Sequence, residues 1–245
     1  MAKEELSATG GSAHQSRGSA TSDAILRAGL RLIAESGYSA VSIRRICQEA
    51  GVNLALMNYH FGSKAQLLEA IFRRWGGGVN SARVRLLNEL EARHVDGLIP
   101  IDELLDAYIS PSLKASHTDL EDELHFIRLS GRVATDPAPE VMEAISAAYD
   151  EAGATFIRLL RKACSHLTTE EFLWRFVFLI GAMVYTRAET GRVESLASKI
   201  GFPARKTSVH NASKYLIPFL TAGLNAPSVD KHVRRPERAD KRNYR

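Results

Sequence analysis

The chain has 245 residues, of which 45% are hydrophobic and 24% charged, a composition typical of a globular protein with one large or two modest domains. Its two cysteines, Cys47 and Cys164, form no disulfide framework or metal-ligand spacing, and the N-terminus lacks the apolar core of a signal peptide. The longest apolar run, residues 172–185, is too short to span a bilayer and contains Arg175, so we expect a cytoplasmic protein that contacts no membrane.

The net charge of +4 is unevenly distributed along the chain. Residues 226–245 contain seven basic and three acidic residues, and residues 21–66 are also basic, whereas residues 67–225 are mildly acidic. Residues 1–20 are rich in Ser, Gly and Ala and have no hydrophobic period. We therefore predict a disordered arm at 1–20, a disordered basic tail at 226–245, and two folded domains between them, 21–66 and 67–225.

Helix start and stop signals divide the first folded domain. A helical apolar pattern begins near Asp23 and ends at Gly37, where glycine favours a helix terminus. Two short helices follow, with Ser42 and Asn53 as their N-caps, and Gly51 between them suits a left-handed turn. This domain is therefore predicted to contain three helices.

A fourth helix is predicted from Lys64 to about Arg93, because Ser63 and Gln66 have the spacing of a capping box. The glycines at 76–78 interrupt its apolar pattern, and each costs roughly 1 kcal/mol in a helix interior relative to alanine. We therefore predict a kink, a hinge or a break at that point.

Five further helical patterns complete the chain, and Thr168 with Glu171 forms a second capping box. Pro111 is predicted to kink the first of these helices. No stretch shows the period-2 alternation of a strand, so the predicted fold is all-α with about nine helices. The five patterns span residues 101–116, 119–132, 139–165, 169–187 and 208–224.

Residues 42–64 have the organisation of a helix-turn-helix, in which buried residues fix the angle between two short helices and the second helix presents its outward residues to DNA. The inward set is Ile43, Ile46, Cys47, Ala50, Val52, Met57 and Phe61. The outward set is Asn53, Leu54, Ala55, Asn58 and Tyr59. The alternative is a helical hairpin whose outer face is only solvated.

The outward residues suit contacts with double-stranded DNA. Asn58 can hydrogen-bond a base edge, while Leu54 and Ala55 can contact thymine methyl groups. Nearby hydroxyl, imidazole and ammonium groups are placed for phosphates, and two arginines early in the first short helix for a phosphate or a guanine edge. The predicted DNA-binding residues are Ser42, Arg44, Arg45, Asn53, Leu54, Ala55, Asn58, Tyr59, His60 and Lys64.

This segment resembles the DNA-binding region of the TetR family of bacterial regulators. The resemblance runs from about Ile25 to Phe72 and rests on Gly37-Tyr38, Ser42-Ile43-Arg44, Glu49-Ala50-Gly51-Val52, Tyr59-His60-Phe61, Ser63-Lys64 and Leu67-Leu68. The chain departs from the common pattern at Asn58, where a tyrosine is usual, and at Leu54 and Ala55, where small polar residues are usual. No relative's operator sequence can therefore be transferred to it.

The resemblance implies a homodimer, because one helix-turn-helix makes few contacts and a two-fold dimer reads both halves of a palindromic operator. It also implies a C-terminal helical body that binds a small-molecule effector. Binding of the effector would change the separation of the two DNA-reading heads and so change affinity for the operator.

Residues 172–185 are apolar almost all round the predicted helix, so this helix must be covered on every side. Its own core can cover one side and a partner subunit the other, and the resemblance implies an intersubunit four-helix bundle made by the last two helices. The alternative is a central core helix of a monomer. The predicted interface residues are Phe172, Arg175, Phe176, Leu179, Met183, Tyr215 and Phe219.

An effector pocket is predicted among the helices between residues 75 and 165. One helical face carries His125, Arg128, Leu129 and Arg132, which would give an apolar cavity a cationic end for an anionic head group. The alternative, which we favour, is that His125 packs in the core and the arginines pair with acids. The predicted pocket residues are Tyr108, His125, Phe126, Leu129, Arg132, Met142 and Tyr149.

The sequence contains no G-x-S-x-G and no H-E-x-x-H motif, and the acids at 121–123 are typical of a solvated first helical turn. We expect no enzyme activity, no cofactor and no metal. The predicted function is a ligand-responsive transcriptional repressor, released from its operator by a small, largely apolar effector. Two alternatives stay open: an all-α ligand-binding protein or enzyme with a purely structural helix-turn-helix, and a nucleoid-type DNA binder without an effector.

Overall fold

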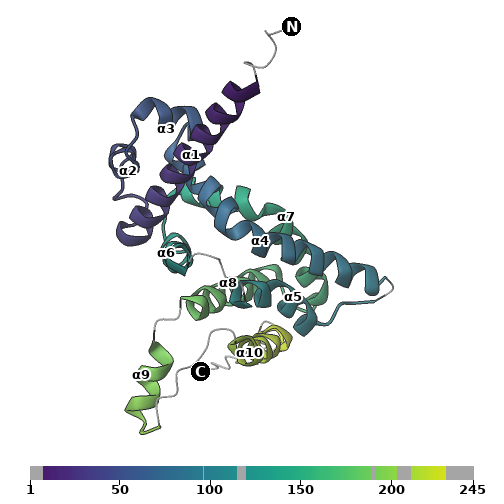
Figure 1. Ribbon diagram of the computed structural model, residues 1–245. Helices are drawn as coiled ribbons and strands as arrows, with labels where there is room; N and C mark the ends of the chain where they lie inside the picture. Colours follow the sequence, from purple (N-terminus) through teal and green to yellow (C-terminus); the bar gives the residue numbers. More distant parts are fainter. Residues whose placement is uncertain (1–7, 96, 115–119, 189–190, 203–210, 230–245) are drawn as a thin grey trace, which may run out of the picture.

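The computed structural model describes residues 8–95, 97–114, 120–188, 191–202 and 211–229, and the structural statements below refer to them. These residues form helices and no strands, as predicted. None of the helices is long and apolar enough to cross a membrane. They are α1 (Ala8–Ser36), α2 (Ile43–Ala50), α3 (Leu54–Phe61), α4 (Lys64–Arg93), α5 (Ile101–Lys114), α6 (Leu120–Val133), α7 (Pro139–Ala163), α8 (Thr169–Arg187), α9 (Arg192–Lys199) and α10 (Ser213–Asn225) (Figure 1).

A first hydrophobic core joins the helix-turn-helix to the adjoining half of the body. It contains residues of α1, α2, α3, the first part of α4, α6 and the first part of α7. Its fully buried side chains include Met57 of α3, Ile71 of α4 and Phe126 of α6. The predicted boundary between residues 66 and 67 therefore crosses a shared core, and we expect the helix-turn-helix to move together with α4 and α6.

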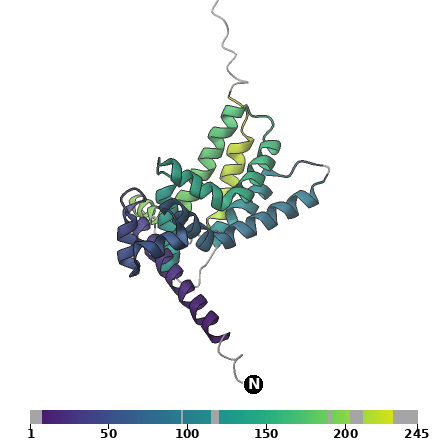
Figure 2. The same cartoon turned by 90° about the horizontal axis from the view of Figure 1, so that it is seen from above.

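A second hydrophobic core fills the rest of the body, between the later part of α4, α5, the later part of α7, α8 and α10. Tyr108 and Phe156 stack in this core with their ring centroids 4.0 Å apart. α8 and α10 lie side by side (Figure 2). α4 and α7 pack against each other and contribute to both cores, so they connect the helix-turn-helix to the helices of the second core (Figure 1).

α4 is one unbroken helix from Lys64 to Arg93, so the chain does not break at the three glycines. Gly76 serves close packing instead, because an added Cβ would lie 2.1 Å from the Tyr149 Oη and 3.3 Å from the Phe126 Cζ. An added Cβ at residues 77–78 would meet nothing within 4 Å. The first glycine of the run therefore lets Tyr149 of α7 approach the backbone of α4.

The helices differ from the predicted ones in two places. Residues 8–20, predicted as a disordered arm, belong to α1, since extending an existing helix costs far less than starting one. α9 has no counterpart among the predicted helices, because it is short and none of its residues is buried. Pro111 lies inside α5, which continues to Lys114.

Some predictions lie outside the described residues. These are the start of the predicted arm, residues 1–7, most of the predicted tail, residues 230–245, and the predicted helix ends at 116, 119 and 208.

Candidate functional site

The N-caps of the helix-turn-helix lie as the sequence predicts. The Ser42 Oγ accepts a hydrogen bond from the Arg45 amide at 3.2 Å, and the Asn53 Oδ1 accepts one from the Leu56 amide at 2.9 Å. Gly51 ends α2 in the left-handed conformation, with φ at 67°. These contacts satisfy amides of the first helical turns and set the path of the chain from α2 to α3.

The residues predicted to face inward pack into the first core. Ile46 and Met57 are fully buried and Cys47 is 6% exposed. An ion pair joins Arg31 of α1 to Glu49 of α2. The remaining members are partly buried against the same core: Ile43, Ala50, Val52 and Phe61. Packing of α2 and α3 against α1 and α4 therefore holds the two short helices at a fixed angle, as DNA reading requires.

The residues predicted to face outward are exposed, namely Asn53, Leu54, Ala55, Asn58 and Tyr59. Tyr59 is 83% exposed, and its ring meets the His60 ring edge-on with centroids 5.2 Å apart. Arg44 and Arg45 are exposed at the start of α2. These side chains present amide donors and acceptors, apolar groups and positive charge, which are the groups that DNA recognition uses.

The Lys64 side chain makes contacts within the protein, whereas we predicted that it contacts a DNA phosphate. Its ammonium donates hydrogen bonds to the carbonyl oxygens of Tyr38 and Val41, each at 3.0 Å, and lies 4.0 Å from the Tyr38 ring centroid. Burial lowers the pKa of Lys64, against the smaller raising effects of Glu140 and Asp136. Lys64 therefore fastens the segment between α1 and α2 to the start of α4.

A cavity of about 260 Å³ lies where the two hydrophobic cores meet. It is bounded by residues of α4, α5, α6, α7 and α8. Phe72 and Val133 in its wall belong to the first core, and Tyr108 and Met183 to the second. Because the helices around the cavity belong to both cores, a molecule bound there would contact residues of the first core, which contains the helix-turn-helix, and residues of α8 at the same time.

Two arginines are the charged residues of the described cavity wall, which also contains Ser112 and Ser130. Arg83 is 5% exposed; its Nε donates to the Tyr108 carbonyl oxygen at 2.7 Å, and its guanidinium lies 4.1 Å from the Tyr108 ring centroid. Arg187 lies 5.3 Å from the Phe126 ring centroid. Burial lowers the pKa of Arg187; Tyr149 opposes this effect and the like charge of Arg83 adds to it. The two guanidinium groups are therefore close enough to repel each other.

A second hollow of about 850 Å³ continues from the cavity toward the surface of α8. The two spaces share wall residues of α6, α7 and α8, among them Ile127, Met142 and Ile180. The outer part of the hollow is bounded by Val177 and Tyr185 of α8. A ligand with a polar head in the cavity would thus have an apolar path that leads toward the outer face of α8.

The structure brings three of the predicted pocket residues to the cavity: Tyr108, Met142 and Tyr149. Phe126 and Leu129 are fully buried members of the first core, and Arg132 borders the second hollow instead. His125 packs toward α1, with its Nε2 3.8 Å from the Glu35 Oε1, in agreement with the favoured alternative.

The arginines at the cavity are therefore not those that the sequence indicated. Arg83 nevertheless carried a signal, because it lies one helical turn from the buried residues Val79 and Leu87 on either side. An arginine on the buried face of a helix is a charge that either has a partner inside the fold or serves a function there.

The sequence profiles of one family match both halves of the chain. The profile described as "Bacterial regulatory proteins, tetR family" matches residues 25–71, and the one described as "Tetracyclin repressor-like, C-terminal domain" matches residues 106–223. The chain belongs to the TetR family. The first match covers the helix-turn-helix, and the second covers α6 to α8 and most of α5 and α10.

One known transcriptional regulator and two solved structures are similar to the chain at low identity. The HTH-type transcriptional regulator BetI of Rhizobium meliloti (strain 1021) is 35% identical over 129 residues, which are 53% of this chain and 50% of that protein. The match thus spans about half the length of that relative. Salmonella enterica GusR is 19% identical, covering 83% of this chain and 94% of that chain, with a TM-score of 0.48. The fatty acid degradation regulator FadR from Bacillus halodurans is 15% identical, covering 82% and 98%, with a TM-score of 0.46.

In this TetR family chain, α8 turns a different face outward from the one predicted as the dimer interface. Phe172, Leu179 and Met183 are buried in the second core of the same protomer, and Phe176 packs against it. These side chains therefore face their own core, and their place in a dimer interface stays an untested prediction. A helix that is apolar on every side does not reveal from its sequence which side its own core covers.

The outward face of α8 is apolar as well. We define the α8/α10 face as the exposed side chains Leu173, Trp174, Val177, Phe178 and Tyr185 of α8 and the predicted Tyr215 and Phe219 of α10. Those of α8 are 55–63% exposed, and those of α10 70% and 72%. A cluster of large apolar groups on neighbouring helices is rare on a monomer surface and is typical of an interaction site.

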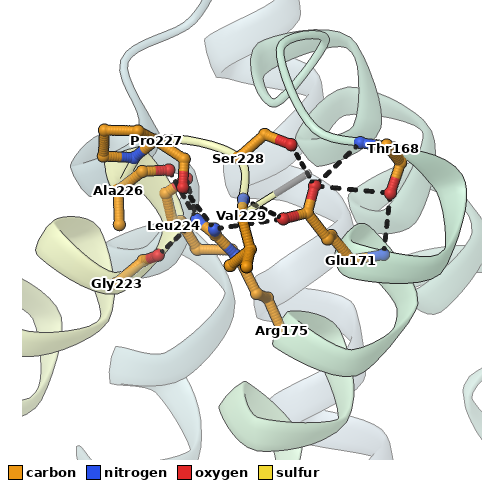
Figure 3. Close-up of polar contacts among 9 residues, drawn as sticks. All are labelled: Thr168, Glu171, Arg175, Gly223, Leu224, Ala226, Pro227, Ser228 and Val229. Atoms are coloured by element: carbon orange, nitrogen blue, oxygen red, sulfur yellow. Dashed lines mark hydrogen bonds and ion pairs between the residues drawn. The ribbon is translucent and has the colours of Figure 1, made fainter. Parts of the chain in front are cut away.

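Arg175, also predicted at the interface, holds the end of α10 instead (Figure 3). Its Nη1 donates to the carbonyl oxygens of Gly223 at 2.8 Å and Ala226 at 2.7 Å, and its Nη2 to that of Pro227 at 3.0 Å. The last carbonyls of a helix have no intrahelical partner and carry partial negative charge. Arg175 therefore caps α10 and attaches it to α8.

Glu171 fastens the residues that follow α10 to the same helix (Figure 3). Its carboxylate accepts hydrogen bonds from the Ser228 hydroxyl at 2.6 Å and from the Val229 amide, and it closes the predicted capping box with Thr168. The hydrogen bond from Ser228, with those from Val229 and Thr168, lowers the pKa of Glu171 to about 2. Residues 226–229, predicted as the start of a disordered tail, are thus held in place.

Proposed function

We propose that the chain is a ligand-responsive transcriptional regulator that binds a palindromic operator in double-stranded DNA as a homodimer. The observation that carries this proposal is the exposed face of α3 on a helix-turn-helix locked into the first core, with Asn58 and Tyr59 outward. The family is one of bacterial regulators, generally not enzymes, and repression is its most usual mode. Such a regulator works in the cytoplasm, where its DNA lies.

The α8/α10 face supports the homodimer. A second copy presenting the same face would cover the apolar side chains of both subunits in a two-fold arrangement. Dimer interfaces are typically more apolar than the remaining surface and use aromatic residues at their centre, as Trp174 and Phe178 would provide. Pairing would also supply the second head that a palindromic operator needs.

The position of the cavity supports control by an effector. α4 and α6 bound the cavity and also pack with α1 in the first core. Arg27 of α1 pairs with Asp122 of α6, and Glu35 lies near His125, so α6 is joined to the head by polar contacts too. An effector that displaces α4 or α6 would move the head with them, and a small, largely apolar effector would thereby release the operator.

A mobility-shift assay with the DNA upstream of the chain's own gene tests the DNA-binding role. We expect sequence-selective, salt-sensitive binding to a palindrome, and Asn58→Ala should cost about 1–3 kcal/mol of discrimination at one base pair. Asn88→Ala, an exposed asparagine on α4, is the matched control and should leave binding unchanged. Absence of selective binding to any palindrome would refute the proposal.

Sedimentation or light scattering of the purified chain tests the homodimer. Phe178→Glu places a charge at the centre of the α8/α10 face and should convert the dimer to a folded monomer, because burying an unpaired carboxylate is costly. Leu98→Glu, at an exposed leucine outside this face, should leave the dimer intact. A dimer that survives Phe178→Glu would place the interface elsewhere.

A further inference from the structure

The cavity between the two cores contains positive charge that its own wall does not neutralise. Arg83 and Arg187 face this space, and its described wall contains no aspartate or glutamate. The hydrogen-bond partners of Arg83 are the Tyr108 carbonyl oxygen and, at 3.5 Å, the Met183 sulfur. A cation removed from water is costly unless an anion or several good acceptors compensate it. Glu123 of α6 acts electrostatically on Arg187 from outside the cavity, but the described wall itself presents these two cations and no anion.

Tyr149 lies near both charges and does not remove them. Burial raises the pKa of Tyr149, and the positive charges of Arg83 and Arg187 oppose that rise. The Arg83 guanidinium lies 6.0 Å from the Tyr149 ring centroid. The phenol is therefore protonated near neutral pH, and its hydroxyl is a hydrogen-bond donor beside the two guanidinium groups.

Apolar side chains also line the cavity, among them Val133, Met142, Ile145 and Ile180. Its volume of about 260 Å³ lies below the roughly 300–1,000 Å³ usual for drug-sized ligands, so its occupant is small. The hollow toward α8 gives additional room for an apolar tail. The cavity wall thus combines two guanidinium groups with apolar side chains.

We propose that this cavity binds a small amphipathic carboxylate, whose anionic group lies between Arg83 and Arg187 and whose hydrocarbon part extends along α6 and α8 toward the second hollow. Planar guanidinium groups match a carboxylate in shape and bind it through paired, charge-assisted hydrogen bonds. The inference rests on the proposed function, since it names the chemical class of the effector. The inference also specifies how the effector acts. A bound anion would remove the repulsion between Arg83 on α4, which packs with the helix-turn-helix, and Arg187 on α8, which bears the α8/α10 face.

Calorimetric titration and thermal unfolding of the full chain test this inference. The probes are straight-chain carboxylates from butanoate to decanoate, with alcohols and alkyl-trimethylammonium ions of matched chain length as controls. We expect saturable binding and a raised Tm with the carboxylates, increasing with chain length until the apolar space is filled, and no comparable effect with the controls. No binding of any carboxylate, or equal binding of the alcohols or ammonium ions, would overturn the inference.

Three variants assign the carboxylate to the arginines. Arg187→Gln should weaken carboxylate binding by about tenfold or more, because it removes a charge-assisted hydrogen bond, and Arg187→Lys should recover only part of the loss. Arg85→Gln removes an exposed arginine of α4 and should leave affinity unchanged. The same assays report whether each variant is folded. Folded Arg187→Gln with undiminished affinity would overturn the assignment.

The mobility-shift assay separates this inference from the proposed function. A chain that binds its palindrome but none of the carboxylates would refute the carboxylate site and leave the regulator proposal standing. A chain that binds carboxylates at the arginines but no palindrome would refute the regulator proposal and leave the site standing. Carboxylates that bind and also lower the affinity for the palindrome would support both.

Discussion

Arg175 and the pair Arg83 and Arg187 are arginines of the same helical body, yet their surroundings differ. Arg175 donates to carbonyl oxygens at the end of α10 and so completes the hydrogen bonding of a helix terminus. Arg83 and Arg187 lie beside aromatic rings and a cavity whose described wall has no acid. The comparison separates a cation that completes a helix terminus from two cations for which we propose a partner from outside the chain.

The helix-turn-helix shows the same contrast on a smaller scale. The Lys64 ammonium is engaged by two backbone carbonyls, whereas Arg44 and Arg45 point into solvent. A positive charge near the DNA-reading surface is thus a phosphate ligand only where the protein leaves its donors open. The predictions that follow test this distinction, beginning with the largest expected effect.

Replacing Arg175 should destabilise the fold most. Arg175→Met removes charge-assisted hydrogen bonds to the last carbonyls of α10, and we expect the free energy of unfolding to fall by about 2–3 kcal/mol. Urea denaturation followed by circular dichroism measures the change.

Two matched variants sharpen this comparison. Arg85→Met breaks only an exposed pair with Glu89 one turn away and should change stability by less than about 0.5 kcal/mol. Arg187→Met removes a half-buried charge that has no acid in the cavity wall, so the ligand-free protein should lose no stability or gain some. A loss as large as that of Arg175→Met would show that Arg187 also serves the fold.

Gly76→Ala should destabilise the protein by about 1–3 kcal/mol, because the new methyl group collides with the Tyr149 side chain. Gly78→Ala is the matched control; its added Cβ meets no atom, so better helix propensity should stabilise α4 by up to about 1 kcal/mol. Thermal unfolding measures both. Combining Gly76→Ala with Tyr149→Phe should recover part of the loss, and no recovery would contradict the contact as its cause.

Lys64→Met and Arg44→Met should have opposite signatures. Lys64→Met loses two hydrogen bonds and should cost about 1–2 kcal/mol of stability while leaving the salt dependence of DNA binding nearly unchanged. Arg44→Met should leave stability within about 0.5 kcal/mol and reduce the salt slope by about one phosphate contact. Binding titrations over a range of salt concentrations distinguish the two; a reduced slope for Lys64→Met would restore it as a phosphate ligand.

The smallest expected effect is a change in stability at acidic pH. The pKa of Glu171 is about 2 in the folded chain, below its ordinary value of 4.5, so its stabilising contribution is complete above 4.5 and is lost as pH falls toward 2. Glu171→Gln should therefore lower stability at neutral pH and make stability less dependent on pH in this window. Unfolding measured across the window checks the slope, and an unchanged slope would rule out Glu171 as the titrating group.

The sequence was sufficient where structure depends on neighbouring residues. Ser42, Asn53 and Gly51 specify their caps and turn through contacts within a few positions, and all three lie as predicted. It was insufficient where two distant helices meet. A glycine is required at position 76 because Tyr149 of α7 approaches it closely, and Arg175 donates to a carbonyl oxygen of α10. In both cases the partner is distant in the sequence, so neighbouring residues do not reveal the role.

The same limit explains the interface and the cavity. The apolar pattern of α8 predicted that the helix is covered on every side. Leu179 lies in the second core while Phe178 is exposed, and the pattern does not indicate which of these two sides the core covers. Arg83 of α4 and Arg187 of α8 come to line the same cavity only in the folded chain, which no local spacing could indicate.

The unbroken course of α4 gives the molecule a lever. From Arg83 to Lys64 the helix spans 19 residues, or about 28 Å at a rise of about 1.5 Å per residue (Figure 1). A tilt of about 5° near the cavity would carry the start of α4, and the head packed on it, through about 2.5 Å. In a two-fold dimer the two displacements add to about 5 Å, more than the roughly 3.4 Å between successive base pairs. A stiff helix can thus convert a small change around one side chain into a mismatch of a whole base pair at the operator.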